Sequence, residues 1–252
     1  EPIYQLVDTG MYYFLSRPRR FGKSLLVSTL RALFEGKRAL FEGLWIAENT
    51  DWAWEPYPVV FLDFNGISHD TPQHLELGLH RAMLAIAQHH QLNLEEPLLK
   101  GQFKELLLKL HRCTGQPVIV LIDEYDKPII DHLGLGEARL RVAEANREIQ
   151  KQYFGVLKDG DVMNVLRLVF ITGVSRFSRV SIFSELNNLN DITLHARYAT
   201  MLGYTQEELE RDFAQHLAQF AAGLDIPTAE LVDRVKDYYN GYRFTKQAVT
   251  VY

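Results

Sequence analysis

The sequence predicts an α/β fold, with parallel strands in one sheet and helices on both of its faces. Three mainly apolar runs, at residues 59–62, 118–122 and 166–172, have the length and content of strands buried on both faces. Stretches with helical spacing separate these runs, and such alternation is typical of parallel strands joined by right-handed crossovers. A short β-rich run at 12–15 predicts a fourth strand, directly ahead of a glycine-lysine-serine loop.

The remaining elements follow in chain order from periodicity and turn residues. Apolar residues at helical spacing predict a helix directly after the loop, and residues 44–57 are expected to form a further loop rich in aromatic residues. Further helices are predicted at 72–91, 96–112 and 137–157.

The pattern changes to helices alone after about residue 200. Thr205 and Glu208 form a capping box ahead of an apolar stripe. We therefore predict two domains, a sheet domain at 1–203 and a small helical or winged-helix-like lid at 204–252, which the end of the chain truncates.

Composition narrows the class of protein. The chain has 252 residues, 47% of them hydrophobic, and a net charge of -5, so no strong overall field attracts it to nucleic acid. No apolar run approaches the ~18 residues of a membrane span, and no signal-peptide pattern opens the chain. One cysteine, Cys113, excludes an internal disulfide. We expect a cytoplasmic protein without membrane contact, and we read the chain as a piece of a longer protein because it begins without methionine.

The run R-P-R-R-F-G-K-S at residues 17–24 ends like a phosphate-binding loop. Glycine lets the backbone approach phosphate oxygens, and the loop's N–H groups form an anion nest at a helix start. In this interpretation Lys23 reaches the β- and γ-phosphates of ATP and Ser24 binds Mg²⁺. The alternative is a basic helix start that binds no nucleotide.

The loop departs from the full motif, because Arg17 stands where the first glycine is usual. Either that position is strained or the loop uses a different turn. Arg19 and Arg20 add positive charge that could contact nucleotide, a partner or DNA, or simply be solvated. The residues assigned to cofactor binding are Arg19, Arg20, Phe21, Gly22, Lys23 and Ser24.

The strand at 118–122 is followed by two acidic residues. Asp123 would hold Mg²⁺, together with Ser24, and Glu124 would act as the general base for the attacking water. The pair favours hydrolysis over phosphoryl transfer to a metabolite, although an ordinary acidic turn after a strand is the simpler alternative. Asp126 and Lys127 are expected to support the site or to form a local ion pair.

The strand at 166–172 ends in Thr172, and Arg176 follows shortly after. In P-loop ATPases of the ASCE class a polar residue at this strand end senses the γ-phosphate, so Thr172, with Ser175 as a second candidate, is assigned that role. Arg176 would stabilise transition-state charge. The alternative is a helix cap followed by a solvated arginine.

Other polar and aromatic residues are set aside. The three tryptophans, Trp45, Trp52 and Trp54, are expected to pack the loop at 44–57, with adenine stacking as the alternative. Asp63 ends a strand expected at the sheet edge, away from the phosphates. With one cysteine and no ligand spacing among the histidines, no zinc site is predicted.

Four segments together resemble one family. They are Y-Y-F-L-S-R-P-R-R-F-G-K-S-L-L, V-L-I-D-E-Y-D-K-P-I, I-T-G-V-S-R-F-S-R-V-S-I-F-S-E-L-N-N-L-N-D-I-T and, near the end, Y-N-G-Y-R-F. They are similar to the predicted AAA-ATPase-like family of bacteria, whose loop also carries arginine at the first glycine position. The resemblance implies an AAA/ASCE-type P-loop domain and a winged-helix-like segment after residue 200. Members are often fused to a C-terminal domain resembling PD-(D/E)XK nucleases, which is absent from this chain.

These observations support three functional hypotheses. The first is an ATPase module that uses ATP and Mg²⁺ and is coupled to a neighbouring effector domain. The second is a nucleotide-dependent switch or scaffold with little turnover, and the third is the ATPase component of a nucleic-acid-processing protein. Homo-oligomerisation and the choice between ATP and GTP stay open.

Overall fold

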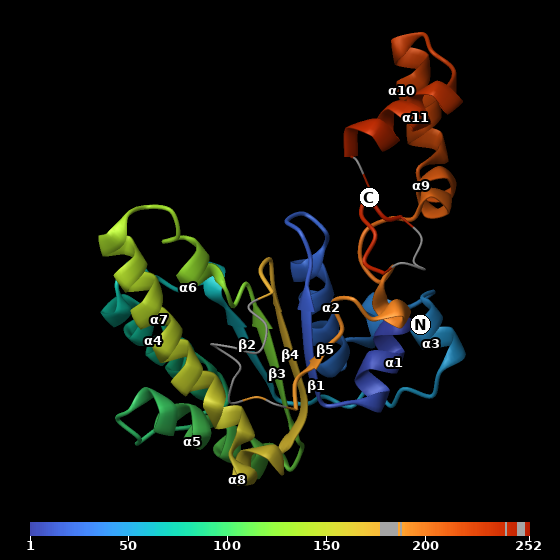
Figure 1. Ribbon diagram of the computed structural model, residues 1–252. Coiled ribbons are helices and arrows are strands. Elements are labelled where there is room, and N and C mark those ends of the chain that lie inside the picture. The colour runs from blue at the N-terminus through green and yellow to red at the C-terminus, as the bar shows by residue number, and fades with distance from the viewer. Residues whose placement is uncertain (177–185, 187, 240, 246–249) are drawn as a thin grey trace. The chain divides into compact units, whose positions relative to one another are not determined.

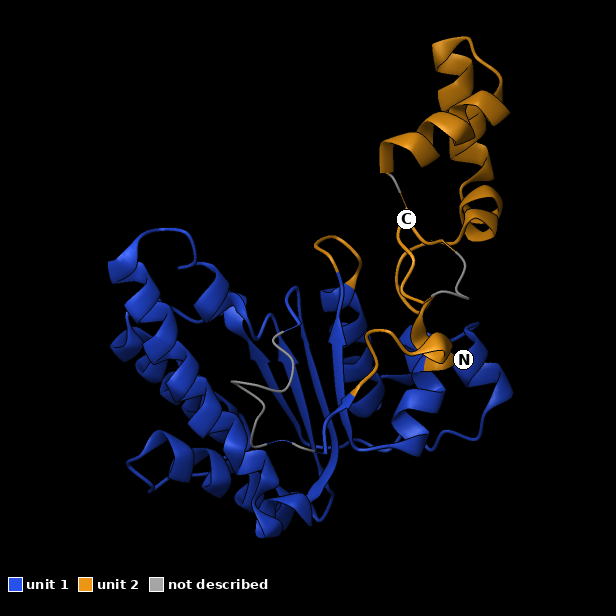
Figure 2. Ribbon diagram, in the orientation of Figure 1, with its two compact units in different colours: residues 1, 3–17, 23–190 blue, residues 2, 18–22, 191–252 orange. Residues whose placement is uncertain are grey.

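The computed structural model describes residues 1–176, 186, 188–239, 241–245 and 250–252. The chain packs into two compact units (Figure 2). The first comprises Glu1, Ile3–Arg17 and Lys23–Asn190, and the second comprises Pro2, Pro18–Gly22 and Asp191–Tyr252. The expected phosphate loop is therefore shared between the two units. Its tip belongs to the second unit, and its last two residues belong to the first.

The sheet contains the expected strands in an informative order. Its strands are β1 (Tyr12–Ser16), β2 (Val59–Asp63), β3 (Val118–Asp123), β4 (Leu166–Gly173) and the short β5 (Asn190–Asp191). They lie in the order β2-β3-β4-β1-β5, and the pairs β2–β3, β3–β4 and β4–β1 are parallel. Because β4 lies between β1 and β3, the carboxyl ends of these three strands form one rim. This arrangement confirms the predicted P-loop NTPase-like α/β fold.

Helices cover both faces of the sheet, as Figure 1 shows, with α2 on one side and α4, α5 and α7 on the other. The helices of this part of the chain are α1 (Pro2–Thr9), α2 (Lys23–Phe34), α3 (Trp45–Asn49), α4 (Pro72–His89), α5 (Leu99–Thr114), α6 (Lys127–Ile130), α7 (Glu137–Gly155) and α8 (Gly160–Met163). Short 3-10 turns lie at Arg38–Phe41, Phe64–Gly66 and Val156–Lys158. The three long predicted helices are confirmed with ends shifted by a few residues.

Local signals explain where the helices begin and end. The Thr71 hydroxyl accepts a hydrogen bond from the backbone N–H of His74 and begins α4, with proline at the first helical position. Gly115, at φ 69°, ends α5 in the left-handed conformation. The expectation of a plain loop at 44–57 is wrong in part, because α3 forms there. The Thr50 hydroxyl donates to the Ile46 carbonyl at 2.6 Å and so satisfies the end of this short helix.

The main core lies between the sheet and the α4, α5 and α7 layer. Its members include side chains of β2 and β3 and the inward stripes of the three helices, and rings of Phe103 and Tyr153 stack at 4.3 Å. Each fully buried leucine or valine there contributes roughly 1.5–3 kcal/mol relative to exposure. This packing holds β2 and β3 side by side and therefore fixes the rim that carries their terminal aspartates.

The second unit contains three further helices with a small core of their own. These are α9 (Gln206–Asp212), α10 (Ala214–Leu224) and α11 (Thr228–Tyr239), packed around Leu217, Ala221, Leu231 and Val232. The predicted capping box forms, because Thr205 and Glu208 each accept the other's backbone N–H. The division by packing at Asn190 and Asp191 precedes the domain boundary near residue 203, which stays a prediction, as does the lid role. Among the described residues, no helix combines the length and apolar content that crossing a membrane requires.

Candidate functional site

The start of α2 and the end of β3 meet through a hydrogen bond. The Ser24 hydroxyl donates to the carboxylate of Asp123, and the charge of Lys23 also acts on that carboxylate. Asp123 is 3% exposed and Lys23 is 6% exposed, whereas Ser24 is open to solvent. The structure therefore brings the last two residues of the phosphate loop to the acidic strand end.

Asp123 occupies an unfavourable place for a bare negative charge. Burial raises its pKa above the ordinary value, and the neighbouring charge of Asp63 adds to the rise. The Ser24 hydroxyl, the Glu124 amide at 2.9 Å and the Lys23 ammonium oppose this rise without cancelling it. A cation bound beside the carboxylate would relieve the desolvation of the charged form.

Asp63 corrects one expectation. Its strand β2 does lie at the sheet edge, but Asp63 is paired in register with Asp123 and stands directly beside it. A strand at the edge of a sheet still places its last residue beside the last residue of the neighbouring strand. The signal was present, because two neighbouring buried strands each end in an aspartate.

The residues at this strand end suit a hard cation. Mg²⁺ prefers oxygen ligands and binds through few protein groups plus phosphate oxygens. Ser24 and Asp123 offer such oxygens, with Asp63 alongside. Within the described ranges, no three histidine, cysteine, aspartate or glutamate residues gather into a site that could hold a metal by themselves.

Glu124 follows Asp123 in a conformation unusual for its residue type. Its φ of 52° lies in the left-handed region, which costs a non-glycine residue roughly 1–2 kcal/mol. Its N–H donates to Asp123 Oδ1 at 2.9 Å, so the sharp turn is held by the strand end itself. Strained backbone of this kind is concentrated at functional sites.

Two aspartate-to-backbone bonds join the ends of β3 and β4. Asp126 Oδ2 accepts the N–H groups of Val174 at 3.1 Å and Ser175 at 2.5 Å. A side chain at Gly173 would collide with the Asp126 carboxylate and with the Tyr125 ring. Of the two alternatives for Asp126 and Lys127, the local ion pair does not form, since Lys127 instead pairs with Asp131 at 3.0 Å.

Thr172 and Arg176 occupy different environments. The Thr172 hydroxyl is fully buried and donates to the Leu15 carbonyl of β1 at 2.7 Å. The Thr172 hydroxyl proton is therefore already engaged within the sheet. Towards any other group, the hydroxyl can act only as a hydrogen-bond acceptor through its oxygen lone pairs. Arg176 is exposed, and the residues from 177 to 185 that follow it lie outside the described part of the chain.

Arg17 resolves the two alternatives for the loop. It is 1% exposed, its N–H donates to the Gly173 carbonyl at 3.3 Å, and its Nη1 donates to the Ser16 carbonyl at 3.0 Å. It does not have a positive φ; Arg20 at 68° and Gly22 at 80° have. The loop thus uses a different turn, and the arginine at the usual glycine position is accommodated without left-handed backbone.

The tip of the loop belongs to the aromatic packing of the second unit. The Phe21 ring meets Tyr242 edge-to-face at 5.0 Å and Phe244 at 5.8 Å, while Arg19 and Arg20 are exposed. Tyr242 and Phe244 come from the Y-N-G-Y-R-F segment, which contributes to the family resemblance but was assigned no part in the site. Their contact with a loop residue more than two hundred positions earlier left no local signal.

Residues 1–183 match the family model described as predicted AAA-ATPase. The chain belongs to this AAA-ATPase-like family. It is also 39% identical, over 251 residues, to a protein of Azotobacter chroococcum mcd 1 described as "Uncharacterized protein in vnfD 5'region". That match covers 97% of this chain and 44% of the relative, so the chain spans less than half the length of the relative.

In this predicted ATPase the three tryptophans pack against other aromatic rings. The Trp52 ring contacts Phe34 at 5.7 Å and lies under the Arg167 guanidinium at 5.9 Å. Arg167 is at the beginning of β4, a strand's length away from Thr172. These contacts favour the packing role over adenine stacking, as do those of Trp45 with Tyr4 and of Trp54 with Phe41.

Proposed function

We propose that this AAA-ATPase-like chain binds Mg²⁺-ATP and hydrolyses it, and that hydrolysis drives a neighbouring effector domain. The observation that carries the proposal is the hydrogen bond from Ser24 to the buried Asp123, with Lys23 beside it. This contact links the helix that follows the phosphate loop to the acidic end of β3. An ordinary acidic turn would not need a buried carboxylate facing the loop's serine.

Each residue has a distinct role in this proposal. Lys23 neutralises the β- and γ-phosphates, and Ser24 and Asp123 supply the oxygens that would hold Mg²⁺. The ion, when bound, adds positive charge between the β- and γ-phosphates. Glu124 orients the attacking water and accepts its proton, and Arg176 responds to charge on the γ-phosphate. Thr172, whose proton is donated to the Leu15 carbonyl, has only its hydroxyl oxygen to offer, as an acceptor for that water.

Two variants, measured for both binding and turnover, separate these roles. Lys23→Ala is expected to weaken Mg²⁺-ATP binding in calorimetry by at least about tenfold, which corresponds to ~1.4 kcal/mol. Glu124→Gln is expected to keep binding and to lose turnover by roughly 10²–10⁴-fold in a phosphate-release assay. Lys100→Ala, an exposed lysine on α5, is the matched control. Unchanged turnover in Glu124→Gln would remove Glu124 from the mechanism.

A nucleotide-dependent switch is the second candidate, and the packing of Phe21 favours it. If the loop tip is part of the second unit, phosphate binding at the loop alters the environment of Tyr242 and Phe244. Limited proteolysis of the second unit with and without Mg²⁺-ATP tests this candidate. Strong nucleotide-dependent protection together with negligible phosphate release identifies a switch; protection with steady turnover identifies an ATPase.

The effector in this proposal is a neighbouring domain of a longer protein. The family resemblance implies a nuclease-like C-terminal domain, and more than half of the Azotobacter relative lies outside the match. We infer that ATP hydrolysis is coupled to such a domain. Comparing the rate of ATP turnover in this chain with the rate in the longer protein measures that coupling. Identical turnover under all conditions would argue against coupling.

A further inference from the structure

The outer side of strand β2 is an open backbone edge. The Ile119 N–H donates to the Pro58 carbonyl at 2.9 Å, and Val59 is in parallel register with Ile119. In a parallel ladder alternate residues bond to the same neighbour, so Val60 and its alternates face β3 while Val59 and Phe61 turn their N–H and C=O groups outward. β2 is the last strand of the sheet on this side, and within the described residues no strand pairs with its outer edge.

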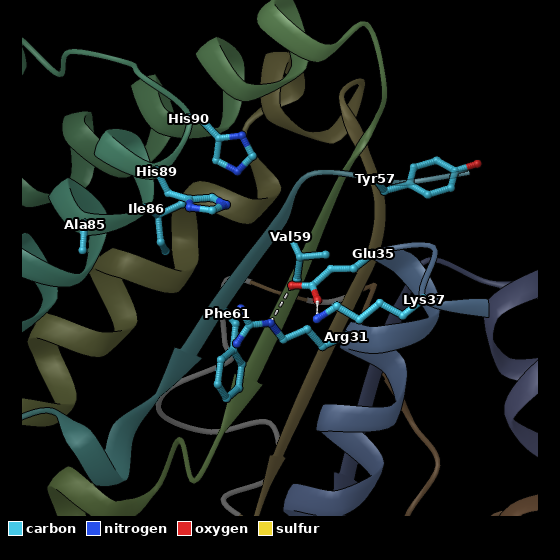
Figure 3. Close-up of a pocket in the computed structure, with 10 residues that line it drawn as sticks. All are labelled: Arg31, Glu35, Lys37, Tyr57, Val59, Phe61, Ala85, Ile86, His89 and His90. Carbon is cyan, nitrogen blue, oxygen red and sulfur yellow. Dashed lines mark hydrogen bonds and ion pairs between the residues drawn. The ribbon is translucent and has the colours of Figure 1, made fainter. Parts of the chain in front are cut away.

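A groove of about 540 Å³ runs along this edge (Figure 3). Val59 and Phe61 of β2 lie between two walls. One wall comes from the end of α2, from Lys37 after it and from Tyr57 just ahead of β2, and the other comes from the last turns of α4. The walls consist of Arg31, Glu35, Lys37 and Tyr57 on the α2 side, and of Ala85, Ile86, His89 and His90 on the α4 side.

The α2 wall carries excess positive charge. Arg31 and Lys37 both pair with the single carboxylate of Glu35, at 2.7 and 2.5 Å. Burial alone would raise the pKa of Glu35, but the hydrogen bonds from Lys37 and Arg31 outweigh it and lower that pKa, so Glu35 is charged at neutral pH. Two cations therefore face one anion along this wall.

Arg31 is also oriented for a second acceptor. Its guanidinium lies over the Phe61 ring at 5.4 Å, and its Nε donates to Glu35. A guanidinium has five N–H donors, so the terminal nitrogens can bind a further carboxylate without breaking the first pair. An arginine on an aromatic face beside an open strand edge is a ready site for an acidic side chain.

We propose that this groove binds an extended acidic segment of a partner protein, which adds to the sheet as a strand beside β2. Backbone bonds to Val59 and Phe61 would give affinity, and side-chain pockets would give specificity. Because side chains alternate along a strand, those on the α2 side would be Asp or Glu facing Arg31 and Lys37. Those on the α4 side would be apolar and pack near Ile86. This surface uses none of the groups assigned to the nucleotide.

Designed peptides test the proposal on the whole chain. The probe is a fluorescent peptide of about eight residues that alternates glutamate and valine, and its partner replaces each glutamate by lysine. The glutamate peptide is expected to bind in fluorescence anisotropy at least about tenfold more tightly than the lysine peptide. It should also slow amide hydrogen exchange at Val59 and Phe61, which contact through side chains alone would not do.

Variants separate the groove from general charge effects. Arg31→Glu is expected to weaken binding of the glutamate peptide by at least about tenfold. Arg38→Glu makes an equal charge change at an exposed residue outside the groove and is expected to leave binding of that peptide unchanged. If Arg31→Glu fails to fold, Val59→Pro serves instead, since proline at this edge position removes an outward N–H without taking a hydrogen bond from the ladder with β3. No peptide binding, equal binding of both peptides, or equal loss in both charge variants would overturn the proposal. Protection of Val59 and Phe61 that rises with protein concentration in the absence of peptide would also overturn it, because a second copy would then occupy the edge.

Discussion

The two ends of the parallel sheet are built from opposite chemistry. At the carboxyl end lie buried Asp123, the left-handed Glu124 and the Asp126 bonds to β4, whereas at the amino end Trp52 packs on Phe34 beneath Arg167. The amino end gains stability from aromatic burial. The carboxyl end contains desolvated charge and strained backbone, both of which cost stability and both of which suit a site for phosphate and metal.

The largest effect should come from breaking the aromatic end. Phe34 is fully buried and contacts both Trp52 and Tyr57. Phe34→Ala is expected to lower the free energy of unfolding by about 3–5 kcal/mol, because it leaves a cavity. Denaturant unfolding measures this, and nucleotide affinity of the folded fraction should stay unchanged. A loss below about 1 kcal/mol would contradict the view that this end holds the sheet together.

Adding a methyl group at the carboxyl rim should have the next largest effect. Gly173→Ala places a side chain against the Asp126 carboxylate and the Tyr125 ring. Overpacking of this kind costs about 1–3 kcal/mol. We expect a lower melting temperature together with slower ATP turnover, in contrast to Phe34→Ala, which should reduce stability alone. Gly134→Ala tests a glycine with open space around its Cβ position, although its φ of 77° adds some strain.

Removing the charge of Asp123 should raise the stability of the nucleotide-free protein, whereas the two substitutions above should lower stability. Its pKa is raised mainly by burial, so the folded state holds the proton more tightly than the unfolded chain does. That contribution favours folding at low pH and is lost as pH rises through the folded-state pKa, which leaves a buried charge at neutral pH. Asp123→Asn is therefore expected to raise the melting temperature of the nucleotide-free protein at pH 7 and to abolish stabilisation by Mg²⁺-ATP. A lower melting temperature at neutral pH would contradict this account.

Replacing Asp131 should lower the stability of the protein slightly, which is the usual direction for an aspartate held in ion pairs. Burial alone would raise its pKa, but hydrogen bonds from Lys127 and His69 outweigh burial and lower it. The stability it contributes is present above the ordinary aspartate pKa and is lost as pH falls through the folded-state value. Asp131→Asn should cost about 1 kcal/mol or less at pH 7, and the difference from the unmodified protein should shrink in acid titrations of unfolding.

The strands and the residues at their ends could be predicted from the sequence because those signals are local. Apolar runs of strand length ended at Asp123 and Thr172, and Gly22 with Lys23 opened an amphipathic helix. The structure confirms these strands and their alternation with helices. Their order in the sheet then follows from the β4 position between β1 and β3.

The rest depended on contacts between distant residues. Asp63 was missed because register between β2 and β3, not position in the chain, places it beside Asp123. The packing of Phe21 on Tyr242 and the bonds of Asp126 to Val174 and Ser175 likewise join segments far apart in sequence. A single sequence carries no periodic signal for such pairs.

The bonds from Asp126 to the end of β4 have a consequence for protein engineering. They bring the two ends of a long chain excursion, which holds α6, α7 and α8, to one point. The turn between α6 and α7 in this excursion, around Gly134 and Gly136, forms an exposed tip with open space at both glycines. A foreign domain inserted at that tip would leave the fastening at Asp126 intact, so it is the natural place to attach a fluorescent reporter to this ATPase-like domain.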